Sequence, residues 1–245
     1  MQLNIYPEIL EALKKTEQDS LSWNIDQASI INQTKRILFL NAHGVNLTSC
    51  NGNFLKELLA SDYLLRDGIG LELGFKYLNL KKTENLNGTD LIPKILHANK
   101  DKKIAVWGSS DEALRKLRAR LKDEGYHNLA PMQHGFHLDE FYLEEYNSVK
   151  PDILILCMGM PRQEILSGKL AKLEHSSLII CGGGWADFYS GHKKRAPEWV
   201  RKIKMEWVHR LCSEPFRLGK RYTIDLAHYF FIIYKITHCK KEKTL

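Results

Sequence analysis

The stretch S-L-I-I-C-G-G-G-W-A-D-F-Y-S-G, residues 177–191, decides the fold of this chain. Its apolar start reads as a buried strand, and three glycines follow at the carboxyl end of that strand. Because glycines leave the backbone bare, a ligand can closely approach the N–H groups of such a turn. The acid and aromatic residues after the glycines suit a planar ring, and the basic residues 193–195 suit phosphate. The alternative is a tight turn on a basic surface.

Apolar runs of strand length alternate with helical patterns along most of the chain. The predicted strands are residues 36–40, 63–66, 103–107, 152–157 and 177–181, and the predicted helices are 54–59, 69–78, 89–99, 112–124 and 162–173. Thr89 or Asp90 is expected near the N-cap of the third helix. Repeated strand–turn–helix units predict an α/β fold, with a Rossmann-like, mainly parallel sheet and helices on both faces.

Polar residues and glycines stand where each predicted strand ends. These residues are Asn41, Asp67, Gly108, Gly159 and Gly182. Ligands of open parallel sheets bind outside the carboxyl ends of the strands. The sequence therefore predicts a binding site at this edge of the sheet.

The charge of the chain is concentrated in its last part. Residues 193–245 carry a net charge of +9, whereas residues 1–192 carry −2. This change predicts a catalytic domain over residues 1–192 and a basic helical appendage over residues 193–245. Such an appendage indicates an anionic partner, which can be phospholipid, nucleic acid or a phosphorylated substrate, unless it is only a solvated helix face.

Five cysteines without metal-ligand spacing, and ten scattered histidines, predict no structural zinc and a reducing compartment. The first residues lack the pattern of a secretory signal. The longest late apolar stretch, Tyr229–Tyr234, falls far short of the roughly 20 residues that a spanning helix needs. We therefore expect a protein that does not cross a membrane by itself.

The motif D-G-I-G-L-E-L-G, residues 67–74, resembles a dinucleotide-binding fingerprint but has the spacing G-x-G-x-x-x-G. No acid that suits a ribose follows at the usual distance, so an oxidoreductase is a weak alternative. Asp67 lies between a strand and a helix, where a carboxylate can act as a general base. An N-cap role for Asp67 remains the plain alternative at this point.

Two features favour a diphosphate ligand. The motif G-M-P-R-Q-E, residues 159–164, opens a helix whose free N–H groups and positive dipole end suit an anion, unless they are merely capped. No D-x-D motif is present, so a reaction that expels diphosphate needs cationic side chains in place of Mg²⁺. Arg210, Arg217 and Arg221 in the appendage are candidates, since guanidinium groups bind phosphate oxygens bidentately.

Seven motifs occur in the order found in WecG/TagA/CpsF glycosyltransferases, over about residues 37–222. They are Asn41-Ala42, Asp67-Gly-Ile-Gly70, Gly88-Thr-Asp-Leu91, Gly159-Met-Pro-Arg-Gln-Glu164, Gly182-Gly-Gly-Trp-Ala-Asp-Phe188, Arg195-Ala-Pro197 and the run from Glu206 to Tyr222. This resemblance implies a GT-E type fold. It implies a hexosyltransferase that moves a sugar from a UDP-sugar to a polyprenyl-diphosphate-linked sugar, inverts the anomeric centre, and needs no metal or other cofactor.

The resemblance also implies the sugar, the pathway and the place of action. Family members transfer N-acetylmannosamine, its uronate or a related hexose in the biosynthesis of teichoic acid, common antigen, capsule or other exopolysaccharide. They work on the inner face of the bacterial plasma membrane. We therefore expect a cytoplasmic, peripheral membrane enzyme, with a homo-oligomer as a further possibility.

Roles for single residues follow by motif. Asp67 resembles the catalytic base, and Asn41, from the motif Asn41-Ala42, is expected to be the second catalytic residue. Asp187 resembles the residue that binds uracil, Phe136 the aromatic that stacks on it, and Gln163 a residue near the diphosphate. The remaining expected contacts are the backbones of Gly108, Gly183 and Gly184, and the leaving-group arginines Arg210, Arg217 and Arg221. Phe39 and His43 depart from the family, in which a threonine and an acid are common, and this bears on the donor sugar.

The competing hypothesis is a non-catalytic nucleotide-binding or nucleic-acid-binding protein whose basic arm follows phosphates. That class of protein predicts steep salt dependence and no preference for UDP. The resemblance favours the glycosyltransferase, with no nucleic acid among its partners.

Overall fold

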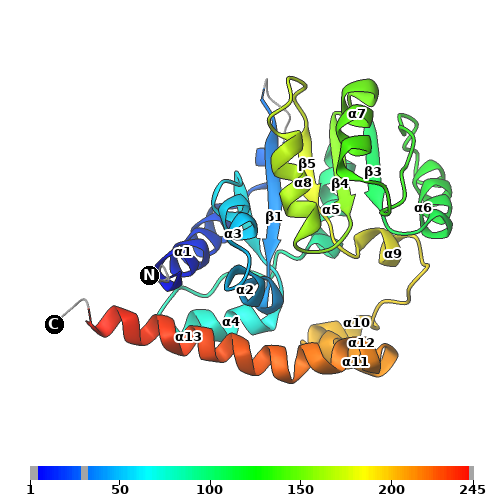
Figure 1. Cartoon of the computed structure of the whole chain (residues 1–245). Helices are drawn as coiled ribbons and strands as arrows, with labels where there is room; N and C mark the ends of the chain where they lie inside the picture. Colours follow the sequence, from blue (N-terminus) through cyan, green and yellow to red (C-terminus); the bar gives the residue numbers. More distant parts are fainter. Residues whose placement is uncertain (1–4, 29–32, 243–245) are drawn as a thin grey trace.

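The computed structural model describes residues 5–28 and 33–242, and its centre is a parallel sheet of five strands in the order β2-β1-β5-β4-β3 (Figure 1). The strands are β1 (Lys35–Leu40), β2 (Tyr63–Arg66), β3 (Ile104–Gly108), β4 (Ile153–Cys157) and β5 (Leu178–Cys181). Every predicted strand begins and ends within one residue of its observed bounds. The predicted parallel α/β fold is therefore confirmed.

Helices cover both faces of this sheet. Along β4, Leu154 and Leu156 join one apolar cluster, while Ile153 and Ile155 join the other. The first cluster includes residues of α1 (Tyr6–Ser22), α2 (Ala42–Thr48), α3 (Gly52–Leu59), α4 (Ile69–Tyr77), α7 (Asp139–Val149) and α8 (Arg162–Leu170), and the second includes residues of η1 (Ile25–Ala28), α5 (Gly88–Ala98), α6 (Asp111–Asp123) and α9 (Trp185–Tyr189). Strands buried on both faces read as continuous apolar runs, which is why the sequence showed them clearly.

Strands β1 and β5 are neighbours in the sheet although they are far apart in sequence. From the carboxyl end of β1 the chain enters α2 on one face, and from β5 it enters α9 on the opposite face. Adjacent strands whose connections diverge in this way leave a crevice between them, which is where open α/β sheets bind ligands. Asn41 and the three glycines, residues 182–184, border this crevice.

Helix α1 closes the edge of the sheet, and the sequence analysis did not predict it. The β2 edge would otherwise leave backbone N–H groups without partners. Instead the Leu64 N–H donates to Asp19 Oδ2 at 2.8 Å, and the Arg66 N–H donates to Ser20 Oγ at 2.9 Å. Side chains of α1 therefore replace a sixth strand.

Helix α5 begins close to Thr89 and Asp90, as expected, and neither of them is the cap itself. Asn87 caps this helix, and its Oδ1 accepts the Asp90 N–H at 3.1 Å. Thr89 and Asp90 lie inside the first turn instead.

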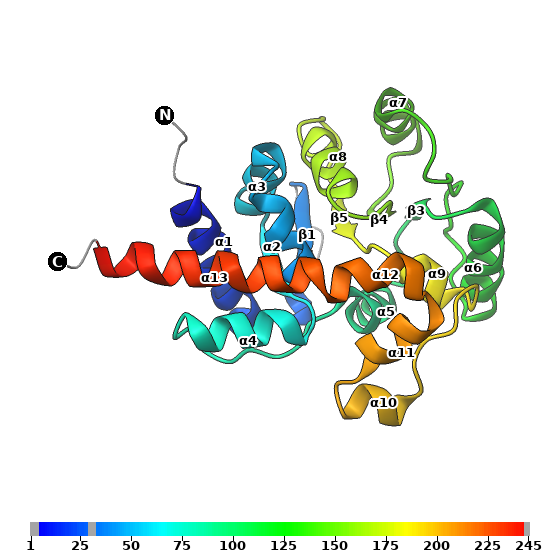
Figure 2. The same cartoon turned by 60° about the horizontal axis from the view of Figure 1, so that its bottom comes forward.

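The basic C-terminal part forms α10 (Glu198–Lys202), α11 (Glu206–Ser213), α12 (Pro215–Tyr222) and α13 (Ile224–Glu242) beneath the carboxyl ends of the strands (Figure 1). Helix α13 crosses α1 and α2 and runs beside α4 (Figure 2). Its buried residues Tyr229, Ile232, Ile233 and Ile236 belong to the first apolar cluster. The end of the appendage thus packs on the body. The division into a catalytic domain over residues 1–192 and an appendage over residues 193–245 stays a prediction.

Candidate active site

A cleft of about 1490 Å³ lies between the carboxyl ends of the strands and the appendage. It draws residues from the ends of β1, β2, β4 and β5 and from α10 to α13. The predicted site residues that line it are Asn41, Asp67, Gln163, Gly183, Gly184, Asp187, Arg210 and Arg221. Residues separated by as many as 180 positions in sequence therefore meet in one cavity.

Asp67 follows β2 and faces Asn41, which follows the neighbouring strand β1. The Asn41 amide nitrogen donates to Asp67 Oδ2 at 3.3 Å, while Asn41 Oδ1 accepts the Gly44 N–H at 3.0 Å and caps α2. Helix α4 has Gly68 at its N-cap and no side-chain cap. The N-cap interpretation of Asp67 is therefore wrong, and its carboxylate faces the cleft.

The electrostatic surroundings of Asp67 make it a stronger base than an ordinary aspartate. Burial raises the pKa of Asp67, and Glu206 of α11 raises it further. The hydrogen bond from Asn41 and the charges of Arg210 and Arg221 lower the pKa, but less than burial raises it. A carboxylate with a raised pKa takes up a proton more readily near neutral pH.

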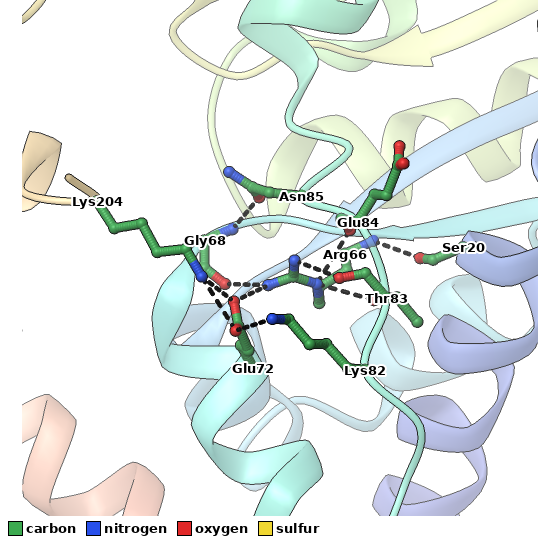
Figure 3. Close-up of polar contacts among 9 residues, drawn as sticks. All are labelled: Ser20, Arg66, Gly68, Glu72, Lys82, Thr83, Glu84, Asn85 and Lys204. Carbon is green, nitrogen blue, oxygen red and sulfur yellow. Dashed lines mark hydrogen bonds and ion pairs between the residues drawn. The ribbon is translucent and has the colours of Figure 1, made fainter. Parts of the chain in front are cut away.

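Arg66, directly before Asp67, is a buried cation that the sequence analysis did not single out (Figure 3). Its Nη1 donates to the Gly68 carbonyl at 3.0 Å, and its Nη2 donates to the Thr83 carbonyl at 2.7 Å. Its Nε also donates to Thr83 Oγ1 at 2.8 Å. Arg66 therefore holds the turn beside the candidate base against the loop of residues 79–87. An arginine that ends an apolar strand, just before Asp-Gly, was the signal for this role.

Glu72 of α4 connects this network to the appendage. Its carboxylate lies 3.4 Å from Arg66 Nη1 and accepts hydrogen bonds from Lys204 Nζ at 3.1 and 3.0 Å (Figure 3). A second link joins Arg195 to Asp90 through two hydrogen bonds, at 2.5 and 2.9 Å. The appendage is thus fastened by ion pairs at two points beside the cleft.

The glycine-rich turn after β5 is held from behind by α8. Gly183 has a φ of +56°, and a Cβ there would meet no atom within 4 Å, so glycine serves the backbone conformation at this position. The Gly183 N–H donates to Gln163 Oε1 at 3.1 Å, and the Gly159 N–H donates to the same oxygen at 3.2 Å. The Gln163 amide nitrogen donates to Glu164 Oε1 at 2.8 Å.

Asp187 lines the cleft from α9, which follows β5. Its Oδ1 accepts a hydrogen bond from the Ser109 hydroxyl, and its Oδ2 lies 3.5 Å from Lys193 Nζ. Ser109 was not predicted as a site residue, although it directly follows Gly108, the last residue of β3. Asp187 keeps acceptor capacity for an N–H group such as that of a uracil ring.

Phe136 and Gly108 do not line the cleft, unlike the other predicted contacts whose side chains are described. Phe136 is 79% exposed, on a loop whose Gly135 N–H donates to the Ser109 carbonyl at 3.0 Å. Arg162 supports this loop by donating to the Gly135 carbonyl at 2.6 Å and to the His137 carbonyl. The stacking role of Phe136 stays a prediction.

Gly108 serves the packing of the sheet. It ends β3 with a φ of +121°, and a Cβ there would lie 2.3 Å from the carbonyl carbon of Cys157 on β4. A side chain at this position would therefore push the two strands apart. Its nucleotide contact stays a prediction as well.

The appendage brings arginines to the cleft from two helices. Arg210 lies on α11, with its guanidinium 5.4 Å from the centre of the Phe188 ring, and Arg221 lies on α12. Arg217 is also on α12, but its side chain lies outside the described part of the structure. Arg210 and Arg221 contribute to the electrostatic field at Asp67, so cationic groups and the candidate base share one cavity.

The two departures from the family pattern have structural counterparts. Phe39 is buried, and a Cβ on Gly88 would lie 3.2 Å from its ring, so Phe39 packs under the start of α5. His43 Nδ1 lies 3.6 Å from Asp225 Oδ2 of α13. Burial lowers the pKa of His43, and the charge of Arg221 lowers it further, which favours a neutral imidazole at this wall of the cleft.

Two structural features are absent from the described residues. Over residues 5–28 and 33–242, no three His, Cys, Asp or Glu side chains are grouped so that they could hold a metal ion. Within the same ranges, no helix has the length and apolar character needed to cross a membrane.

Comparison with known proteins gives a consistent result. The model of the "Glycosyl transferase WecG/TagA/CpsF family" matches residues 11–243. A protein of Bacillus subtilis (strain 168), named N-acetylglucosaminyldiphosphoundecaprenol N-acetyl-beta-D-mannosaminyltransferase, is 28% identical over 196 residues, which are 78% of this chain and 73% of that protein. Proteins with the same name from Staphylococcus aureus strains MW2 and NCTC 8325 / PS 47 are each 26% identical over 220 residues, 86% of this chain and 84% of theirs.

Proposed function

The chain belongs to the WecG/TagA/CpsF family of glycosyl transferases, and from this premise we propose that it transfers a sugar from a UDP-sugar to a polyprenyl-diphosphate-linked sugar. The names of the relatives favour N-acetylmannosamine as the sugar, and N-acetylglucosamine on diphosphoundecaprenol as the acceptor. The uronate of N-acetylmannosamine and related hexoses are the other candidates for the donor. The observation that carries the proposal is the meeting of Asp67, Arg210 and Arg221 in one cleft at the strand ends.

The proposed reaction is a single displacement. A hydroxyl oxygen of the acceptor sugar forms a bond to the anomeric carbon of the donor, and Asp67 takes up the hydroxyl proton. The bond from that carbon to the diphosphate oxygen breaks, and UDP leaves with the electron pair. Attack from the side opposite the leaving group inverts the anomeric centre. The raised pKa of Asp67 supports its role as the base.

Cationic side chains of the appendage stabilise the departing diphosphate in this proposal. Arg210 and Arg221 line the cleft, and Arg217 is expected to join them. Fixed guanidinium groups in a partly dehydrated cleft stabilise developing charge strongly, because they need no reorganisation during the reaction. The proposed reaction therefore requires no metal ion or other cofactor.

The uridine is placed beside Asp187 in the same cleft. Asp187 accepts the N3–H of uracil, Phe136 stacks on the ring, and the backbone at Gly183 and Gly184 lies along the nucleotide. The hydrogen bond between Ser109 and Asp187 supports this placement, because it connects Asp187 to the loop that carries Phe136.

We also propose that the appendage docks on an anionic membrane surface, where the lipid-linked acceptor lies. Large apolar side chains are exposed on the appendage and on α4: Trp199, Ile203, Phe216, Ile224, Phe231, Tyr234, Leu73 and Tyr77. Such residues beside many Lys and Arg are typical of a surface that lies in a lipid interface. Each Lys or Arg near an anionic leaflet contributes about 1 kcal/mol of binding.

UDP release from a panel of UDP-sugars, with and without a short polyprenyl-diphosphate-GlcNAc analogue, tests the proposed function. The panel contains UDP-N-acetylmannosamine, its uronate, UDP-GlcNAc, UDP-glucose and UDP-glucuronate. Acceptor-dependent release from one donor is expected, and it would identify the sugar. Absence of any UDP binding would contradict the proposal and favour the nucleic-acid-binding alternative.

A further inference from the structure

Gln163, in the wall of the cleft, and Glu164 form a buried polar pair. Only 1% of Gln163 and none of Glu164 is exposed. Their motif opens α8, and the family resemblance predicts that Gln163 lies near the diphosphate of the nucleotide. The structure gives its side chain other partners.

The hydrogen bonds of Gln163 determine the orientation of its amide. Two backbone donors, the N–H groups of Gly159 and Gly183, converge on one side-chain atom of Gln163, so that atom must be the oxygen. The amide nitrogen then points to Glu164 Oε1, 2.8 Å away, and requires an acceptor there. Glu164 meets this requirement whether or not its carboxyl is protonated.

The two glycines belong to different turns. Gly159 follows β4, and Gly183 follows β5, the strand beside the crevice. One amide oxygen therefore joins two loops whose backbones border the cleft. Since both N–H groups are already bonded to Gln163, they are not free to bind a ligand.

We propose that Gln163 and Glu164 are positioning residues that hold the turns after β4 and β5 in their ligand-binding shape. Glu164 orients the Gln163 amide, and Gln163 joins the two turns. Neither side chain contacts the substrate. This inference rests on the proposed function for the identity of the ligand, a nucleoside diphosphate, but the hydrogen bonds themselves are independent of it.

The electrostatics of the pair agree with this role. Burial raises the pKa of Glu164 to about 7, and Oε2 has no hydrogen-bond partner among the described residues. Glu164 interacts electrostatically with the thiol of Cys181, whose pKa is raised by burial, and Arg36, which also acts on this thiol, is paired with Glu57 at 2.7 Å.

An exchange of the two side chains tests the proposal, assayed from about pH 7 to about pH 10, because two adjacent buried carboxyls share a proton until the pH exceeds the raised pKa of the pair. Gln163→Glu alone places two carboxylates against each other, and we expect UDP affinity to fall about tenfold or more. In the double variant Gln163→Glu/Glu164→Gln, the new carboxylate at 163 can accept the two backbone N–H groups, and the new amide at 164 can donate to that carboxylate. The net charge is the same as in the wild type. The double variant is expected to regain UDP affinity to within about threefold of the wild type.

Glu164→Gln is the matched single control, because its amide oxygen can still accept from Gln163, so a small effect is expected. UDP affinity is measured by calorimetry for the wild type, the two single variants and the double variant. The free energy of unfolding of the same four proteins is measured alongside. Direct contact of Gln163 with the diphosphate predicts that the double variant stays as weak as Gln163→Glu, and this result would overturn the proposal. Full affinity in Gln163→Glu alone at the highest pH of the series would also overturn it.

The design separates this inference from the proposed function. If the wild type binds no UDP, the proposed function fails. The positioning role is then judged only from the unfolding free energies of the wild type, the two single variants and the double variant. Recovery of unfolding free energy in the double variant supports the role, and additive losses contradict it.

Discussion

Asp67 shows how one carboxylate receives a chemical role from its neighbours. Its position after β2 keeps it out of the helix cap, since Gly68 occupies the N-cap of α4. Asn41 donates to it from the next strand, and Arg66 holds the turn that follows it. The same side chain on an open surface would have an ordinary pKa and nothing to orient it.

Asp67→Asn removes the proposed base while keeping the size of the side chain. We expect turnover to fall by about 10²- to 10⁴-fold, the usual contribution of a general base. UDP affinity should stay nearly unchanged, because the base acts on the acceptor hydroxyl. Steady-state kinetics and calorimetric UDP binding check both parts. Loss of UDP binding in this variant would reassign Asp67 to a binding or structural role.

The pH dependence of kcat/KM reports on the same carboxylate. Asp67 acts as a base only when ionised, so activity falls as pH drops through its raised pKa. Glu206 raises this pKa, so Glu206→Gln should move the acid limb of the profile to lower pH. Arg210 lowers it, so Arg210→Gln should move the limb to higher pH. If the acid limb moved in the same direction in both variants, a group other than Asp67 would be titrating.

Helix α13 joins the appendage to the body of the protein. It places its apolar face on α1, α2 and α4, and it continues directly from α12, which carries Arg221. The contact with α4 is close, because a Cβ on Gly74 would lie 1.8 Å from the Tyr229 hydroxyl oxygen. The packing of α13 therefore helps to place a cleft arginine.

Gly74→Ala is expected to destabilise the protein by about 1–3 kcal/mol, because the added methyl group displaces α13. Chemical denaturation measures this change. Gly52→Ala is the matched control, since a Cβ there meets nothing within 4 Å and should leave stability equal or slightly higher. Adding Tyr229→Phe to Gly74→Ala removes the nearest clashing atom and should restore part of the loss. No restoration would mean that α13 is not the element displaced.

For the molecule as a whole, the appendage combines positive charge, exposed apolar side chains and a packed helix. Deleting residues 193–245 would remove Tyr229 and its neighbours from the core together with the basic surface. Loss of activity after that deletion would therefore not separate membrane docking from misfolding. Substitutions at exposed positions give a cleaner test.

Trp199→Ser/Phe216→Ser should weaken binding to vesicles that contain anionic phospholipid by about tenfold or more, since each exposed aromatic gains about 1.5–3 kcal/mol on burial. Trp199 is 67% exposed, and Phe216 is fully exposed, so folding should be unaffected. Leu21→Ser on α1, 50% exposed, is the control and should bind normally. Vesicle sedimentation measures the effect. Equal binding by all three proteins would exclude this surface as the docking face.

The strands were predictable from the sequence because both faces of the sheet are buried, and helices α3, α4, α5, α6 and α8 were predictable from their helical patterns. Such strands appear as unbroken apolar runs, and the runs at residues 36–40 and 152–157 gave them to within one residue. The glycines and polar residues after each strand also predicted the edge where the cleft lies. Local pattern was sufficient for these features, because burial and turn geometry act over a few neighbouring residues.

Partners that are distant along the chain were not predictable. The sequence marks Arg66 as an arginine at the end of an apolar strand, but it does not show that Thr83 is its partner. Nothing local to Gln163 indicates that it joins Gly159 to Gly183. Helix α1 has an apolar pattern of helical period, but its hydrogen bonds to the N–H groups of β2 are likewise set only by the fold. Hydrogen bonds and charge fields depend on distance in space, and only the folded chain sets those distances.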